Sequence, residues 1–208
     1  MNHPITFRPY TASDRAALIG IIREAWHYDR FASPKTAARM ARLFLDSCLA
    51  SQTFAQVAVS GDVPVGIIMA KDRLQHRPTF TGRLRQLRSL AALVAHREGR
   101  EVMQIFADVH HVDDHLLANC SRHYDSEIVF FAVSGHMRGQ GLGRRLFGHA
   151  AQHLREKGRQ HCFLFTDTSC NYAFYEHLGL TRRAEKALTL NVQGERATMC
   201  FFLYDFAL

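Results

Sequence analysis

The sequence predicts an α/β protein built on a central mixed β-sheet. Residues 127–133 are rich in β-branched and aromatic side chains, which is typical of a buried central strand. A glycine-rich turn at 135–143 follows, and from Leu142 to Leu154 apolar residues recur at every fourth position, as in an amphipathic helix. Residues 161–166 predict the next strand, which the strand–helix–strand order makes parallel to the first. Hairpins predicted on either side of this unit add antiparallel strands.

Local signals place the remaining elements. Ser13 or Asp14 can cap a helix, Pro34 suits the first turn of another, and Ser60–Pro64 reads as a hairpin turn. The elements expected, in chain order, are a strand at 5–9, helices at 13–29 and 34–50, strands at 54–59 and 65–70, an inserted amphipathic helix within 71–102, a strand at 101–109, a short helix at 113–124, the strand, turn and helix of 127–157, a strand at 161–166, and a closing hairpin of 181–191 and 195–206 around Gln193 and Gly194.

The turn before the long helix has the composition of an anion site. It contains Gly135, Gly139, Gly141 and Gly143, which can take positive φ or let a ligand approach the backbone. A helix beginning there leaves several backbone N–H groups unpaired at the positive end of the helix dipole, where phosphate is the usual occupant. Arg138 can add a charge-assisted hydrogen bond. An ordinary tight connection between strand and helix remains the alternative interpretation.

Two common phosphate-binding patterns fit this turn poorly. No Gly-Lys-Ser/Thr follows, so the P-loop pattern fails. Gly139 and Gly141 fit the first two glycines of a dinucleotide fingerprint, but Arg144 occupies the third position. Asp167 ends the next strand roughly where a ribose-binding acid would lie. A Rossmann-type nucleotide binder is therefore the weakest alternative that stays open.

The run Arg138-Gly139-Gln140-Gly141-Leu142-Gly143 resembles the R/Q-x-x-G-x-G/A signature of the GCN5-related N-acetyltransferase (GNAT) superfamily. Residues 171–180 also resemble, in compacted form, the second cofactor motif of that family. The resemblance is strongest over 127–179. It implies one domain over 1–208 with a mixed, mostly antiparallel, twisted sheet of about seven strands flanked by helices. It also implies an N-acetyltransferase that moves the acetyl group of acetyl-CoA to an amine.

The same resemblance implies which residues bind acetyl-CoA. The turn would hold the pyrophosphate, main-chain groups of the central strand would hold the pantetheine arm, and Asn171 would hydrogen-bond that arm. An N–H at or near Phe131 would stabilise the oxyanion. The residues implied for the cofactor are Phe131, Ala132, Val133, Arg138, Gly139, Gln140, Gly141, Leu142, Gly143, Arg144, Asn171 and Phe174.

Glu127 and Tyr175 are the predicted catalytic residues. An amine is mostly protonated at neutral pH, so a base must remove a proton before it attacks the thioester. Glu127 has the position of the base in histone-type relatives, and strand alternation would place it on one face with Val129, Phe131 and Val133 among apolar neighbours, which raise a carboxyl pKa. The position of Tyr175 in its motif implies the acid that protonates the departing thiolate.

Each catalytic assignment has an alternative. Glu127 could be a strand-edge carboxylate in water or in an ion pair, and Tyr175 a buried structural aromatic. Cys170 suggests a competing route through an acyl-cysteine, which needs a nearby base and a depressed pKa. Direct attack within a ternary complex is the preferred mechanism.

The sequence offers fewer signals for the residues that contact the acceptor. In the family, the first two helices and their connection form part of the acceptor wall, which makes Trp26, Tyr28 and Phe31 candidate substrate contacts. An aromatic satellite core is an equally good explanation for them. The resemblance implies an amine-bearing small molecule or peptide as acceptor and allows a homodimer, but it does not select the acceptor.

Basic charge leaves two other functions open. The formal net charge is +7, and the segment 71–102 carries the arginines 73, 77, 83, 85, 88, 97 and 100. Such charge suits CoA as well as nucleic acid. Because aromatics are not regularly interleaved with these arginines, a solvated arginine face packed on the domain is favoured over nucleic-acid binding. A nucleic-acid-associated protein acting through these arginines and a non-catalytic CoA-binding sensor are the alternatives.

No metal, membrane segment or disulfide is expected. One short stretch has the residue types of a metal site, namely His110, His111, Asp113, Asp114 and His115. Ligands adjacent in sequence, however, rarely converge on one ion. The five cysteines are odd in number and lack CxxC spacing, so reduced thiols in a cytoplasm are the simpler interpretation. No apolar run is long enough to cross a bilayer, and residues 1–10 do not resemble a signal peptide. A cytoplasmic protein is expected.

Overall fold

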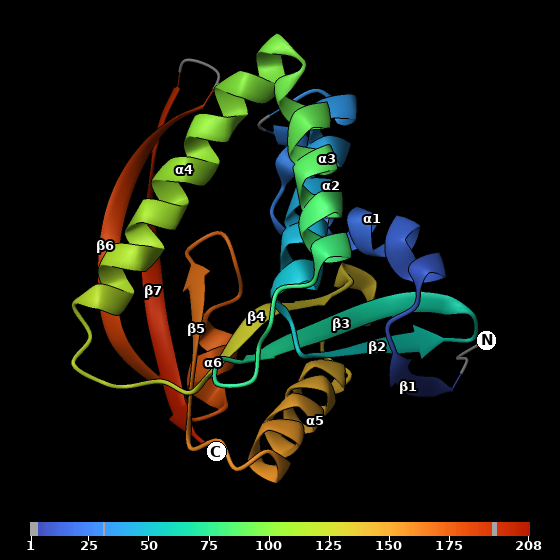
Figure 1. Cartoon of the computed structure of the whole chain (residues 1–208), viewed down its shortest axis with the longest axis vertical. Helices are drawn as coiled ribbons and strands as arrows, with labels where there is room; N and C mark the ends of the chain where they lie inside the picture. The colour runs from blue at the N-terminus through green and yellow to red at the C-terminus, as the bar shows by residue number, and fades with distance from the viewer. Residues whose placement is uncertain (1–3, 31, 193–194) are drawn as a thin grey trace.

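The computed structural model describes residues 4–30, 32–192 and 195–208, and its centre is one seven-stranded sheet (Figure 1). The strand order is β1-β2-β3-β4-β5-β7-β6, and every neighbouring pair is antiparallel except the parallel pair β4–β5. The mixed, mostly antiparallel sheet expected from the sequence is therefore confirmed. The strands are β1 (Ile5–Pro9), β2 (Phe54–Ser60), β3 (Val63–Asp72), β4 (Ser126–Val133), β5 (His161–Asp167), β6 (Thr181–Val192) and β7 (Glu195–Ala207).

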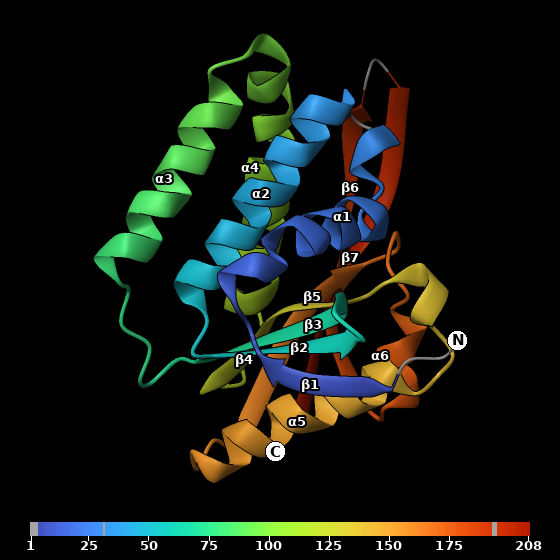
Figure 2. The same cartoon turned by 90° about the vertical axis from the view of Figure 1, so that its right-hand side faces the viewer.

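Helices cover both faces of the sheet (Figures 1 and 2). One face of β2–β4 packs on α5, the opposite face packs on α1 and α2, and α4 lies along the long β6–β7 hairpin. The α-helices are α1 (Arg15–Ala25), α2 (Pro34–Ser51), α3 (Phe80–Val94), α4 (Arg97–Ala118), α5 (Leu142–Glu156) and α6 (Ala173–His177), and the 3-10 turns are Ala12–Asp14, Tyr28–Arg30 and Gly135–Met137.

Two local predictions about helices and turns need comment. The first helix stops at Ala25 rather than near Asp29, because His27 adopts a positive φ of 52°, which ends a right-handed helix. The predicted turn of the closing hairpin, Gln193 and Gly194, lies outside the described residues.

The strand predicted at 101–109 is wrong, as is the separate helix at 113–124. Residues 101–109 and 113–118 belong to α4, and residues 119–124 lie outside any helix. Because α4 begins inside the predicted insertion, the segment after β3 forms the two helices α3 and α4. Val102, Phe106, Val109 and Leu116 are spaced by three, four and seven residues and face the core, which is the period of a helix and not of a strand. Of the part of the chain described, no helix is both long and apolar enough to cross a membrane.

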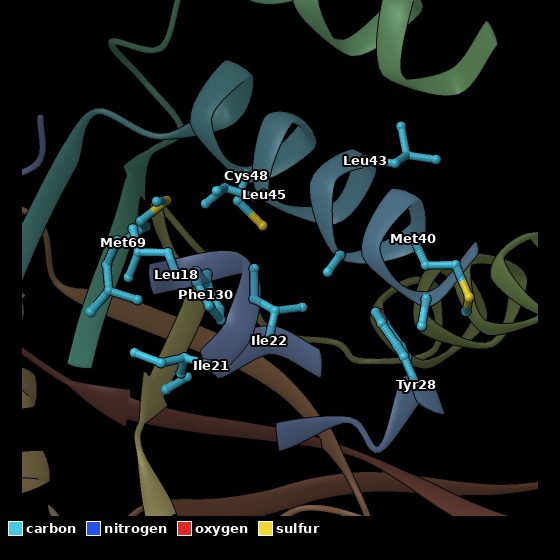
Figure 3. Packing of buried hydrophobic residues seen from close by; sticks show 14 of the residues in the cluster. Leu18, Ile21, Ile22, Tyr28, Met40, Leu43, Leu45, Cys48, Met69 and Phe130 are labelled. Atoms are coloured by element: carbon cyan, nitrogen blue, oxygen red, sulfur yellow. The ribbon is translucent and has the colours of Figure 1, made fainter. Parts of the chain in front are cut away.

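The hydrophobic core between the sheet and the helices α1 and α2 fixes the position of both helices. Figure 3 shows Leu18 and Ile22 of α1 and Leu45 of α2 packed with Met69 and Phe130 of the sheet. Leu18, Ile22, Leu45 and Met69 are fully buried. Because this packing holds the end of α1 against the sheet, it also positions the residues that follow α1.

A buried ion pair joins the first three helices. The carboxylate of Asp46 in α2 accepts hydrogen bonds from Arg15 Nη1 of α1 at 2.7 Å and from Ser89 Oγ of α3 at 2.6 Å. The Asp46 side chain is 1% exposed. The arginine-bearing helix α3 is therefore fastened to the fold by a polar group on its inner side, while Arg83, Arg85 and Arg88 remain exposed.

A β-bulge in β4 changes which face Glu127 occupies. Met69 of β3 pairs with Phe130, but the next residue, Ala70, pairs with Ile128, so Val129 is the extra residue. Ile128 packs on the α5 side, next to Phe131 and Val133 in the same cluster. Glu127, which alternates with Ile128, therefore lies on the α1 and α2 face. The expectation that Glu127 shares a face with Phe131 and Val133 is wrong, because simple alternation ignores the inserted residue.

Candidate active site

A cleft opens where β4 and β5 separate. The two strands pair only at Ser126–Cys162 and Glu127–Phe163, and beyond this point both line a cleft of about 740 Å³. The glycine-rich turn and the start of α5 form one end of the lining, and the residues after α1 together with α4 also contribute. Diverging strands leave main-chain polar groups of β4 without a sheet partner, and an extended ligand can use them.

The turn before α5 has the geometry of an anion site. Gly139 and Gly141 adopt φ values of 79° and 72°, a left-handed conformation that costs other residues about 1–2 kcal/mol. Within the described residues, the backbone N–H groups of 139–144 have no hydrogen-bond partner. Arg138 and Arg144 line the same end of the cleft and form no ion pair with any described residue. Backbone donors, helix dipole and guanidinium groups therefore converge on one place.

Aromatic rings form the wall beside this turn. The rings of Phe131 and Phe174 stack at 5.4 Å, and a Cβ added to Gly143 would lie 3.2 Å from each ring. Glycine at this position therefore lets α5 start close to the wall. The residues of the predicted cofactor set that line the cleft are Phe131, Ala132, Val133, Arg138, Gly139, Gly141, Leu142, Gly143, Arg144, Asn171 and Phe174. Gln140 does not line it, since its amide is directed to Met137 Sδ at 3.9 Å.

Glu127 lines the cleft at the point where the strands part. Burial raises the pKa of Glu127, and the charges of Lys71 and Arg73 lower it in part. Its carboxylate has no ion pair and no hydrogen bond to any residue that the structure describes. The alternative of an ion-paired strand-edge glutamate is not what the geometry shows. A desolvated, unpaired carboxyl is suited to accept a proton near neutral pH.

Tyr175 of α6 lines the same cleft. Its ring is 9% exposed and packs edge-on against Phe131 with centroids 6.4 Å apart. Burial raises the pKa of the Tyr175 phenol, and the charges of Cys170 and Asp167 add to this effect. The hydroxyl therefore stays protonated at neutral pH, which is the form that a proton donor needs.

Comparison with known proteins identifies the family. The profile of the Acetyltransferase (GNAT) family matches residues 20–180, well over half of the chain. The chain belongs to the GNAT family of acetyltransferases. A comparison with curated protein sequences gives no significant match.

Solved structures show the same fold at low sequence identity. PH1933 from Pyrococcus horikoshii is 15% identical with a TM-score of 0.62, and the match covers 99% of each chain. The PaiA N-acetyltransferase from Thermoplasma acidophilum, solved in complex with coenzyme A, is 13% identical with a TM-score of 0.53 and the same coverage. The ribosomal-protein-S18-alanine N-acetyltransferase from Escherichia coli is 14% identical with a TM-score of 0.55, covering 98% of this chain and 94% of its own.

Cys170 of this GNAT protein lies in the cleft but is not activated. Burial raises the pKa of the Cys170 thiol to about 11, and the charge of Asp167 contributes. The group is therefore a thiol rather than a thiolate at neutral pH, and a thiol is a poor nucleophile. This environment disfavours an acyl-cysteine route.

The residues predicted to contact the acceptor do not all line the cleft. Trp26 lines the cleft and packs against Phe44 and Phe130, with centroids at 4.9 and 5.7 Å. Tyr28 is instead buried in the core against Phe106 and does not line the cleft. Phe31 lies outside the described residues. Tyr28 is therefore a core residue, whereas Trp26 both packs on the core and lines the cleft.

Two acidic residues of the cleft were not predicted as acceptor contacts. Asp167 is 8% exposed and accepts hydrogen bonds from Ser169 N at 2.7 Å and Ser169 Oγ at 2.5 Å. Asp113 of α4 lines the cleft, and burial together with the charges of Asp167, Glu127 and Asp114 raises its pKa to about 7. The helical period of 102–116 was the signal that could have placed Asp113 on the inner side of α4.

The histidines and acids around Asp113 do not gather into a metal site. They occupy successive positions of α4, and His110 pairs instead with Asp114, Nε2 to Oδ2 at 3.6 Å, on the exposed side. In the described ranges no group of three or more such side chains could hold one ion.

Proposed function

We propose that this protein is an N-acetyltransferase that moves the acetyl group of acetyl-CoA to an amine by direct attack in a ternary complex. The observation that carries the proposal is the position of Glu127. It is a partly buried carboxylate, unpaired among the described residues, in the same cleft as the glycine-rich turn. Both Glu127 and Tyr175 line the cleft, which favours a catalyst over a CoA-binding sensor.

The chemistry follows from the residues that line the cleft. The turn at 138–144 would bind the pyrophosphate, and the free edge of β4 would hold the pantetheine arm beside Phe131 and Phe174. Glu127 takes a proton from the ammonium group of the acceptor, and the resulting amine attacks the thioester carbon. A main-chain N–H near Phe131 would bind the oxyanion. As the C–S bond breaks, Tyr175 donates its proton to the thiolate, and the second proton that the acetylated nitrogen loses restores the phenol.

The solved neighbours support the donor and the acceptor class. The Thermoplasma neighbour binds coenzyme A, and the Escherichia coli neighbour is named for acetylating an alanine of a ribosomal protein. Strands from both ends of the chain meet in one sheet, which supports a single catalytic domain over 1–208. An amine-bearing small molecule or peptide, acetylated in the cytoplasm, is the acceptor class we propose.

The anion turn can be tested by binding alone. In calorimetric titrations, the double variant Arg138→Ala/Gly141→Ala is expected to raise the Kd of acetyl-CoA about 10- to 100-fold, because it loses a charge-assisted hydrogen bond and strains a left-handed residue. Arg85→Ala, which removes an exposed arginine of α3, is the matched control and should leave Kd unchanged. If the wild type binds neither acetyl-CoA nor CoA, or binds NAD instead, the proposed function is wrong.

One substitution can test whether the Tyr175 hydroxyl donates a proton or only has a structural role. Tyr175→Phe keeps the packed ring and is expected to lower kcat about 10- to 100-fold by removing the proton donor. Tyr172→Phe is the control, because Tyr172 packs on Phe202 and does not line the cleft. Steady-state rates of CoA release measure both variants. An unchanged kcat for Tyr175→Phe would assign the hydroxyl a purely structural function.

A further inference from the structure

The inner face of α3 holds this helix against the fold. On that face Gln86 Nε2 donates a hydrogen bond to Ser47 Oγ of α2 at 3.1 Å, and Leu93 is fully buried. In Figure 2, α3 stands at the edge of the molecule, and the helices α2 and α4, against which it packs, both lie on one side of it. The opposite face of α3 is therefore turned to solvent.

The outer face of α3 carries a line of apolar side chains. Four residues spaced by four, three and four positions lie along it, namely Phe80, Leu84, Leu87 and Ala91. Phe80 is 80% exposed and Leu87 is 60% exposed, and Leu74 in the segment before the helix is 63% exposed. Single exposed apolar residues are ordinary on a protein surface, but a line of them on one helix marks an interaction surface.

Positive charge surrounds this apolar line. From residue 73 to residue 97 the chain contains six arginines and no Asp or Glu. The helical positions of Arg83 and Arg88 lie on opposite sides of the line. Both side chains are exposed, and neither forms an ion pair with a described Asp or Glu at 4.0 Å or less. The outer face of α3 therefore presents apolar groups between unpaired arginines.

Charge and shape select one kind of partner for this face. The phosphate backbone of a nucleic acid would attract the arginines but offers nothing apolar to Phe80 and Leu87. A second copy of this chain would bring like charges together, because a two-fold interface places the same surface on both subunits. A protein partner would need a groove that encloses a convex helix. An anionic lipid bilayer supplies phosphate groups and an apolar layer without a matching shape.

We propose that the outer face of α3 binds the surface of an anionic lipid bilayer. The helix lies in the plane of the surface, with Phe80 and Leu87 at the boundary between head groups and acyl chains. Arg83 and Arg88 extend to lipid phosphates, as the long stem of arginine allows. No residue of α3 lines the active-site cleft, so this inference does not rest on the proposed function.

Flotation of the full chain with lipid vesicles tests the charge contribution. The wild type is expected to bind vesicles of equal parts phosphatidylglycerol and phosphatidylcholine at least about 10-fold more tightly than vesicles of phosphatidylcholine alone. Arg83→Ala/Arg88→Ala should weaken binding to the anionic vesicles about 10- to 30-fold. Arg155→Ala/Lys157→Ala is the matched control, because it removes two exposed charges on the opposite side of the sheet and should change binding less than about twofold.

A second pair of variants tests the apolar contribution. Phe80→Ser/Leu87→Ser should weaken binding to the anionic vesicles about 10- to 100-fold, because it removes the side chains that enter the bilayer. Val63→Ser is the control, since Val63 at the start of β3 is 59% exposed and lies away from α3. All variants should keep the urea unfolding midpoint and the Kd of acetyl-CoA of the wild type.

Loss of binding in both α3 variants, with both controls unchanged, would support the proposal. Absence of wild-type binding to the anionic vesicles would overturn it, as would an equal loss in the Arg155→Ala/Lys157→Ala control. Full binding by Phe80→Ser/Leu87→Ser would also overturn it, since charge attraction alone would then explain the result. If an acidic amphipathic peptide binds this face and the vesicles do not, the face belongs to a protein partner and the proposal is wrong.

Discussion

Glu127→Gln is expected to lower kcat by about 100- to 1000-fold, the range typical for loss of a general base. Glutamine keeps the size of the side chain but cannot take a proton from the ammonium group. The glycine-rich turn proposed to bind the pyrophosphate and Arg138 are untouched, so the Kd of acetyl-CoA should stay within about twofold of the wild type. A large change in kcat with unchanged cofactor binding would place Glu127 in the chemical step.

The pH dependence of the wild type provides a second signature. Glu127 must be ionised to act as a base, and burial raises its pKa. The rate should therefore rise with pH through a point above the ordinary glutamate value of about 4.3. In Glu127→Gln this acidic limb should disappear, because the titrating group is gone.

Rates of CoA release between about pH 5 and 9 would cover the titration of a carboxyl whose pKa is raised. They would measure both the loss of kcat and the loss of the acidic limb. Glu101→Gln is a suitable control, since Glu101 is exposed on α4 and its side chain is 63% accessible. Protein stability should not confuse the result, because Glu127 forms no ion pair in the described structure that glutamine would break. A loss of kcat smaller than about fivefold would exclude Glu127 as the sole base.

Asp46→Ala is expected to lower the free energy of unfolding by about 3 kcal/mol, the largest stability effect that we predict. The substitution removes a carboxylate that is 1% exposed and leaves Arg15 and Ser89 without their partner. Arg15 itself is three-quarters covered, with a side chain 25% exposed. An unpaired guanidinium in that setting costs more than the lost attraction alone.

Urea unfolding at neutral pH would measure this change. Asp62→Ala is the matched control, because Asp62 is exposed in the β2–β3 turn and a surface substitution usually changes stability by less than about 0.5 kcal/mol. Ser89→Ala should fall between the two, since it removes one hydrogen bond but no charge. If Asp46→Ala costs no more than Asp62→Ala, the junction of α1, α2 and α3 does not depend on this carboxylate.

Local patterns in the sequence were sufficient for the central unit of the fold. The strand at 127–133, the glycines of the turn and the four-residue period after Leu142 each depend on neighbours in the chain. For this reason β4, the turn and α5 lie where they were predicted, and Gly139 and Gly141 of the turn adopt positive φ. The same is true of the parallel strand β5, because the strand–helix–strand order determines its direction.

Contacts between residues far apart in the chain decided which way several side chains of the cleft face. The bulge at Val129 appears only in the register of β4 against β3, and it moves Glu127 to the face opposite Phe131. Trp26 and Tyr28 are two residues apart, yet the end of α1 directs one to the cleft and the other to the core.

Which residues of α4 face the cleft also depends on tertiary packing. The sequence alone determined the strand–turn–helix unit, whereas tertiary structure decided which face of the sheet Glu127 occupies and whether Asp113 lines the cleft. Asp113 reaches the cleft because Val112 and Leu116 pack against strands β5 and β7, which follow much later in the chain. Local sequence sets the type of an element, but the surface against which it packs sets which of its side chains can act.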